Sequence, residues 1–94
     1  MKLYYWPKTR AFCALWMLEE MRVPYDLEFV NIRAGAQNDA AFCRVNPMSK
    51  LPALEDRGVC VAESDAVLLY LADRFPDTQL GVPFDDVARG RFLQ

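Results

Sequence analysis

The pattern of apolar residues in the first third of the chain predicts a strand, a helix and a second strand. Residues 2–6 are rich in aromatic side chains and are followed by proline, which is typical of a β-strand. Thr9 can cap a helix that runs to about Met21, because apolar residues recur there at helical spacing: Phe12, Leu15, Trp16 and Leu18. Residues 25–32 alternate apolar and polar side chains, which predicts a second strand.

The middle of the chain predicts a short helix followed by a hairpin. Residues 34–39 carry Gly, Asn and Asp and are typical of a loop, and residues 39–44 predict a short helix that ends before Pro47. Residues 51–54 and 59–62 are two apolar segments separated by a turn that ends in glycine. Their close spacing favours a β-hairpin.

The last strong pattern is a helix that Ser64 can cap and that runs to Phe75. The resulting order, β-α-β-α-β-β-α, predicts an α/β domain with a mixed sheet and helices on both faces. Residues 77–86 contain Pro, Gly and acidic residues and are typical of a linker. Residues 87–94 begin a new helical pattern, so we expect the natural protein to continue. In the helix from Ser64 to Phe75, the apolar residues predicted to be buried are Val67, Leu68, Leu71 and Phe75.

Composition limits the classes of partner. The chain has 94 residues, of which 53% are hydrophobic and 26% charged, so it can bury a core as one domain. Its net charge is −2 and it has no run of like charges, which indicates neither nucleic acid nor an anionic membrane as a partner. With no pattern of a signal peptide after Met1, we expect a cytoplasmic protein.

Cysteine and histidine usage excludes several chemistries. The chain has three cysteines without a CxxC pair, which argues against a disulfide scaffold and a zinc site. It has no histidine, so Cys–His and Ser–His nucleophiles and histidine-ligated metals are excluded, and we expect no metal. We expect Cys13, Cys43 and Cys60 to be packing residues.

Three segments in this order resemble the glutathione S-transferase superfamily: residues 3–20, 46–56 and 63–76. The resemblance implies a thioredoxin-like fold with a four-stranded mixed sheet and a cis-proline before the third strand. It also implies a glutathione-binding domain over residues 1–76, a linker over 77–86 and the start of a helical second domain at 87–94. Glutathione would then be the co-substrate, an electrophilic small molecule the second substrate, and the protein a cytoplasmic homodimer active in detoxification.

The resemblance aligns Pro52 with the cis-proline of the family. Such a bond would turn the backbone of Leu51 toward glutathione, so that it pairs strand-fashion with the cysteinyl residue. Lys50 would reach a carboxylate of the ligand with its ammonium group. Without the surrounding motif, a trans proline at an edge strand and a solvated lysine would be the simpler interpretation.

Glu63 and Ser64 stand at the predicted start of a helix. Helix N-termini carry unpaired N–H groups and a partial positive charge, which suits a carboxylate. The resemblance implies that Ser64 holds the γ-glutamyl carboxylate of glutathione and that Glu63 pairs with its ammonium group. The alternative is that Ser64 is a helix cap and Glu63 a solvated loop residue.

The thiol-activating position departs from the family pattern. Family members usually have Tyr, Ser or Cys at the start of the first helix, where the resemblance aligns Arg10 with a cysteine and Thr9 with a nearby serine. Thr9 is the first candidate for a hydroxyl that stabilises the thiolate, with a purely capping role as the alternative. Arg10 by its charge and Tyr5 by its hydroxyl are the other candidates, and the alternatives are an exposed arginine and a tyrosine ring that only packs. Trp6 would line the sulfur pocket.

Three functions compete on these residues. The leading hypothesis is a glutathione transferase in which glutathione thiolate attacks an electrophile. A non-catalytic glutathione-binding or regulatory protein of the same fold is the alternative, because the activating position is unusual. A glutaredoxin-like reductase is disfavoured, since Arg10 occupies the place of the reactive cysteine and Cys13 lies one turn too late.

Overall fold

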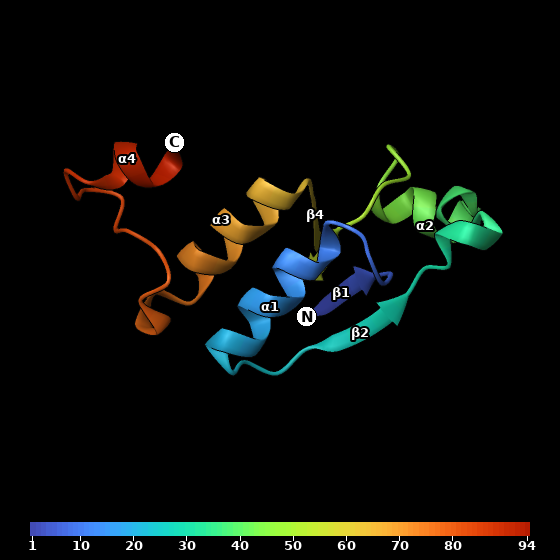
Figure 1. Cartoon of the computed structure of the whole chain (residues 1–94), viewed down its shortest axis with the longest axis horizontal. Coiled ribbons are helices and arrows are strands. Elements are labelled where there is room, and N and C mark those ends of the chain that lie inside the picture. The colour runs from blue at the N-terminus through green and yellow to red at the C-terminus, as the bar shows by residue number, and fades with distance from the viewer.

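The computed structural model describes all 94 residues. Its strands are β1 (Lys2–Tyr5), β2 (Asp26–Phe29), β3 (Ala53–Asp56) and β4 (Val59–Ala62). They form one four-stranded sheet in the order β2-β1-β3-β4. Figure 1 shows β1 and β2 side by side. β1 and β2 are parallel, whereas β3 is antiparallel to both β1 and β4, so the predicted mixed sheet is confirmed.

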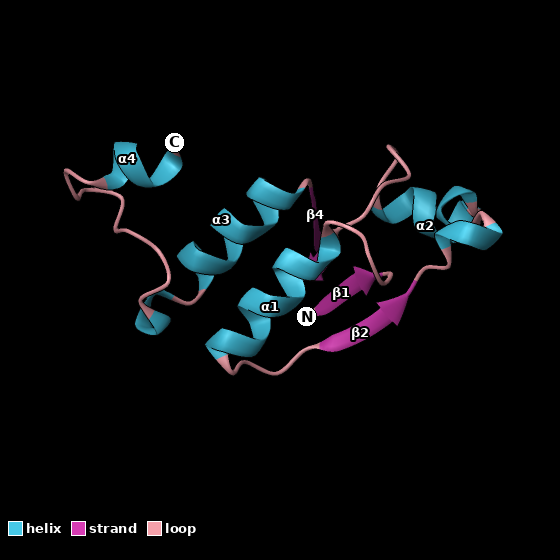
Figure 2. Ribbon diagram, in the orientation of Figure 1, coloured by secondary structure: helices cyan, strands magenta, loops and turns pink.

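The helices follow the predicted order. They are α1 (Ala11–Met21), α2 (Ala40–Val45), α3 (Ser64–Arg74) and a short α4 (Arg89–Leu93). Most of the chain between α3 and α4 is loop (Figure 2). This arrangement is the thioredoxin-like order that the sequence predicts. No helix is both long enough and apolar enough to cross a lipid bilayer.

The two central strands are buried on both faces of the sheet. Leu3 of β1 and Leu54 of β3 face α1 and α3, where they join the larger core. Tyr4 and Ala53, the neighbours of these leucines along the strands, face α2 and pack with Val30 and Phe42 in a second, smaller core. Successive side chains of a strand point to opposite faces, so each central strand contributes to both cores. The rest of the larger core is Ala14, Leu18, Met21, Val67 and Leu71.

The buried face of α1 differs from the prediction. Phe12 and Trp16 are 54% and 59% exposed, and the helix buries its two alanines toward the sheet instead. Small residues let α1 lie close to the sheet and to α3, which leaves the large aromatic side chains on the outer side. The residues of α1 that are buried are Ala11, Ala14, Leu18 and Met21.

Two of the cysteines also lie elsewhere than predicted. Cys13 is exposed on α1 and Cys60 is exposed on β4, so the expectation that they pack inside is wrong. Cys13 follows Phe12 on the outer side of α1, and β4 is an edge strand of the sheet. Cys43 of α2 is half-buried.

The hairpin between β3 and β4 begins two residues later than predicted. Its turn is Arg57-Gly58, and both residues have positive φ, 49° and 79°. This is the backbone conformation of a tight two-residue hairpin turn, for which glycine is well suited. Because β3 starts at Ala53, residues 51–52 lie outside the hydrogen-bonded ladder and belong to the loop before β3.

An ionic cluster joins this hairpin to α3. The buried carboxylate of Asp56 accepts hydrogen bonds from the Tyr70 hydroxyl at 2.9 Å and from Arg74 Nε at 3.3 Å, and Arg57 Nε lies 3.5 Å away. Burial by itself raises the pKa of Asp56, but the hydrogen bonds from Tyr70 and Arg74 and the two guanidinium charges outweigh it and lower that pKa.

We expect Asp56→Asn to lower the free energy of unfolding by about 1–3 kcal/mol at pH 7, because it removes the charged acceptor of both α3 side chains. A carboxyl group whose pKa is lower in the folded state stabilises the fold above its unfolded pKa of about 4, and that contribution is lost as the pH falls through the folded value. The difference between wild type and variant should therefore shrink below about pH 4, as measured by urea unfolding across pH.

Asp85→Asn, at an exposed site without a hydrogen bond to its side chain, is the matched control and should show no such difference. An Asp56→Asn penalty that stays constant from pH 7 to pH 2 would contradict the assignment of the ionic cluster, since the carboxylate charge would then contribute nothing.

Candidate functional site

Three distant segments of the chain meet at one edge of the sheet. Tyr4 near the end of β1 pairs with Ala53 at the start of β3, and Ala53 pairs with Ala62 at the end of β4. The chain leaves β1 toward α1, enters β3 from the loop at 46–52, and leaves β4 toward α3. The pairing of the strands therefore brings the starts of two helices and one loop together.

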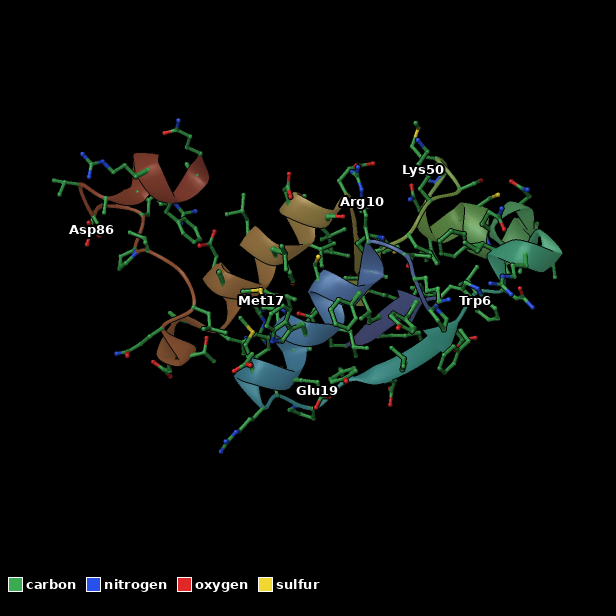
Figure 3. The ribbon with its side chains drawn as sticks, viewed as in Figure 1. Trp6, Arg10, Met17, Glu19, Lys50 and Asp86 are labelled. Atoms are coloured by element: carbon green, nitrogen blue, oxygen red, sulfur yellow. The ribbon has the colours of Figure 1, made fainter.

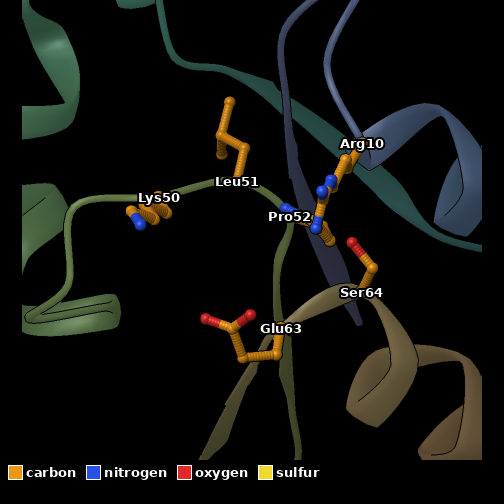
Figure 4. Close-up of a pocket in the computed structure, with 6 residues that line it drawn as sticks. All are labelled: Arg10, Lys50, Leu51, Pro52, Glu63 and Ser64. Atoms are coloured by element: carbon orange, nitrogen blue, oxygen red, sulfur yellow. The ribbon is translucent and has the colours of Figure 1, made fainter.

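A cavity of about 300 Å³ lies at this meeting point (Figure 4). Every residue that lines it was predicted as a site residue from the sequence. Figure 3 shows Arg10 of the first segment and Lys50 of the loop near each other along the upper edge of the molecule. No three metal-ligating side chains come together in the structure. The lining residues are Arg10, Lys50, Leu51, Pro52, Glu63 and Ser64.

The loop before β3 presents free main-chain groups to the cavity. The Leu51–Pro52 peptide bond is cis, and Pro52 is buried. The backbone N–H and C=O of Leu51 make no hydrogen bond within the chain. Because Leu51 lies just outside the ladder of β3, these two groups are available to an extended ligand that pairs as a strand does.

Asn46 holds this loop in place, a role that the sequence did not predict. Its side chain is buried, its Nδ2 donates to the carbonyl of Lys50 at 2.8 Å, and its Oδ1 accepts from the N–H of Met48 at 3.0 Å. The sequence predicts for Asn46 and Pro47 only the end of a helix. A buried amide that bonds two points of a loop fixes the loop's shape, so Asn46 supports the position of Leu51.

Glu63 and Ser64 form the start of α3, but not as predicted. Ser64 is the first helical residue, and its hydroxyl makes no hydrogen bond within the chain, so the expectation that it caps the helix is wrong. Glu63 takes the cap position with φ 71° and ψ 133°, a conformation that side-chain-bearing residues rarely adopt. The first N–H groups of α3 consequently have no side-chain cap.

The charged groups of the cavity have no partners within the chain. The ion pairs of the structure use Arg57, Arg74 and Arg89, and none involves Arg10, Lys50 or Glu63. The lining thus carries two cations and one carboxylate beside the positive end of the α3 dipole. Such a surface suits a ligand with more negative than positive charge.

A second cavity of about 260 Å³ adjoins the first and shares Lys50 and Leu51 with it. Thr9 lines this second cavity. Its hydroxyl donates to the carbonyl of Trp6 at 2.7 Å and accepts from the N–H of Ala11 at 3.3 Å, so it fastens the start of α1 although the cap position belongs to Arg10. The other lining residues are Ile32, Gln37 and Ser49.

Tyr5 and Trp6 line neither cavity. Both rings pack edge-on against Phe29 of β2, with centroid separations of 5.9 Å for Tyr5 and 6.5 Å for Trp6. The structure therefore brings together six of the nine predicted residues in the first cavity and Thr9 in the second, and leaves these two aromatic residues in packing contacts.

Comparison with known proteins is decisive for the family. The profile described as "Glutathione S-transferase, N-terminal domain" matches residues 1–73. The chain belongs to the glutathione S-transferase family. Among its relatives, glutathione S-transferase theta-1 of Rattus norvegicus is 41% identical over 69 residues, which cover 73% of this chain and 29% of the relative. Glutathione S-transferase Z2 of Arabidopsis thaliana is 36% identical over 81 residues, which cover 85% of this chain and 36% of the relative.

Solved glutathione S-transferases share the fold. A sphingomonad enzyme complexed with glutathione superposes with a TM-score of 0.86 at 31% identity, covering 99% of this chain and 47% of that one. A family member from Pseudomonas fluorescens with two glutathione bound gives 0.83 at 30% identity, covering 96% of this chain and 41% of that one. The thioredoxin-like fold is thereby confirmed, and the chain spans less than half the length of these relatives.

Gln37 is a second residue of this glutathione S-transferase domain that the sequence did not single out. It lines the second cavity, and its Oε1 is buried without a hydrogen-bond partner. An unpaired buried amide oxygen costs free energy, so a donor from outside the chain would stabilise it. Gln37 falls in the segment interpreted only as a loop, and nothing in the local pattern marks it.

The strained backbone at Glu63 gives a test of the site's geometry. Glycine tolerates positive φ, whereas alanine carries the same Cβ as glutamate, so Glu63→Gly should be more stable than Glu63→Ala by about 1 kcal/mol. Urea unfolding of both variants measures the difference. An alanine variant as stable as the glycine variant would show that residue 63 does not have this conformation.

Proposed function

We propose that the cavity binds glutathione and that the protein is a glutathione transferase. The observation that carries this proposal is the free backbone of Leu51 between an unpaired carboxylate, an unpaired hydroxyl and two unpaired cations. Glutathione is an extended peptide with two carboxylates and one ammonium group. The cavity lining carries the complementary charges, two cations and one carboxylate.

Each end of glutathione has a complementary partner. The Ser64 hydroxyl and the free N–H groups of α3 suit the γ-glutamyl carboxylate, and the Glu63 carboxylate suits the neighbouring ammonium group. Lys50 borders both cavities and suits the glycyl carboxylate, and the glycyl N–H would be the donor for the unpaired Gln37 Oε1. The cysteinyl residue between these ends would pair with the backbone of Leu51.

The chemical step requires a thiolate. An unperturbed thiol has a pKa near 8.5, so only a few per cent is ionised at neutral pH. The backbone N–H groups of Thr9 and Arg10 make no hydrogen bond within the chain, and donors at the N-terminus of α1 stabilise an anion. The Thr9 hydroxyl would have to leave the Trp6 carbonyl to donate to sulfur. The thiol proton would be released to water. The thiolate would then attack an electrophilic carbon, forming a thioether as the leaving group departs with the electrons of its bond.

A non-catalytic glutathione-binding protein is the second candidate. The hydroxyl of Thr9 is already engaged, and Tyr5 lies in an aromatic cluster, which favours binding without thiol activation. The electrophile, cytoplasmic location and homodimeric assembly belong to the same proposal, supported by relatives more than twice as long as this chain.

We expect Glu63→Gln to weaken glutathione binding about tenfold or more, because the ammonium group would lose its charged partner. Isothermal titration calorimetry measures the dissociation constant. Glu28→Gln on β2, outside both site cavities, is the matched control and should bind as wild type does.

Equal affinities of the Glu63→Gln variant and wild type would remove Glu63 from the site, and absence of binding by wild type would refute the proposed function. Where binding is present, turnover of a generic electrophile with glutathione distinguishes the transferase from the second candidate.

A further inference from the structure

Arg10 lies on the wall of the first cavity that the start of α3 also forms. It lines the first cavity together with Ser64 and is absent from the second, which Thr9 lines. In Figure 4 the guanidinium of Arg10 reaches from the start of α1 toward the Ser64 hydroxyl at the start of α3. Both helix starts therefore contribute a polar side chain to one wall.

The guanidinium of Arg10 has no partner within the chain. It forms no ion pair, although Glu63 lines the same cavity. Nor does any hydrogen bond within the chain hold its side chain, in contrast to Arg74 and Arg89, which bind carboxylates of α3 or the hairpin. An unpaired guanidinium beside uncapped N–H groups makes this wall attractive to an anion.

The geometry points to Arg10 as a specificity residue that binds the α-carboxylate of a γ-glutamyl group together with Ser64 and the start of α3. The inference rests on the proposed function and assigns Arg10 to the carboxylate rather than to the thiol. A planar guanidinium binds a carboxylate through two parallel hydrogen bonds, which a hydroxyl alone does not offer. Glu63 would hold the adjacent ammonium group, so the site selects γ-glutamyl peptides whose α-amino and α-carboxyl groups are both free.

Leu51 lines both cavities, and its position separates carboxylate binding by Arg10 from activation of the thiol. Leu51 borders both cavities, so a cysteinyl residue paired with its backbone lies between Arg10 on one side and Thr9 on the other. The N-terminus of α1, with its free N–H groups, serves the sulfur, while the long side chain of Arg10 extends away toward α3.

The test compares two ligands on the wild-type protein and the Arg10→Ala variant. The ligands are glutathione and 4-aminobutyryl-cysteinyl-glycine, which is glutathione without the α-carboxylate. We expect Arg10→Ala to weaken glutathione binding about tenfold or more, and to leave the affinity for the analogue unchanged. The pKa of the bound glutathione thiol, followed by thiolate absorbance, should be the same in both proteins.

Arg22→Ala, at the opposite end of α1, is the matched control and should bind both ligands as wild type does. Equal losses for the two ligands, or a raised thiol pKa in Arg10→Ala, would overturn the inference, as would unchanged binding of glutathione. Far-ultraviolet circular dichroism verifies that the variant folds, and Arg10→Lys, which retains charge without the planar fork, should recover part of the glutathione affinity. Failure of wild type to bind glutathione at all would instead refute the proposed function, and this inference with it.

Discussion

The burial of β1 and β3 on both faces is the constraint on which the rest of the structure depends. Leu3 and Leu54 are fully buried against α1 and α3, and Tyr4 and Ala53 are buried against α2. A shift of one residue in either strand would exchange the two sets, which fixes the register. That register in turn aligns the end of β1, the start of β3 and the end of β4, and so assembles the cavity from segments far apart in the chain.

The polar groups of the domain divide into two kinds. At the hairpin, Asp56 is satisfied by Tyr70 and Arg74, and its contribution is to hold β3 and α3 together. At the opposite end of these strands, the charges of Arg10, Lys50 and Glu63 and the backbone of Leu51 are left unpaired. Unpaired polar groups and a strained residue next to a cavity weaken the fold, and their concentration at one place is typical of a binding site.

The sequence predicts the element order and the six lining residues of the first cavity, because hydrophobic periodicity and the three family motifs at 3–20, 46–56 and 63–76 are local signals. It does not predict which side of α1 is buried, since apolar residues occur around most of this helix and the choice depends on how closely Ala14 packs on the sheet. The positive φ of Glu63 is also invisible, as glutamate has no preference for it. Asn46 and Gln37 acquire their roles only through contacts made in the folded chain.

The central claim is that glutathione binds where the loop before β3 meets the start of α3. The most direct measurement is an amide nuclear magnetic resonance titration of the isotopically labelled protein with glutathione. The account predicts saturable shifts concentrated at Leu51, Glu63 and Ser64, with little change at Phe29 and Phe42 around the separate pocket on the α2 face. Shifts centred on that other pocket, or no saturable shifts at all, would contradict it.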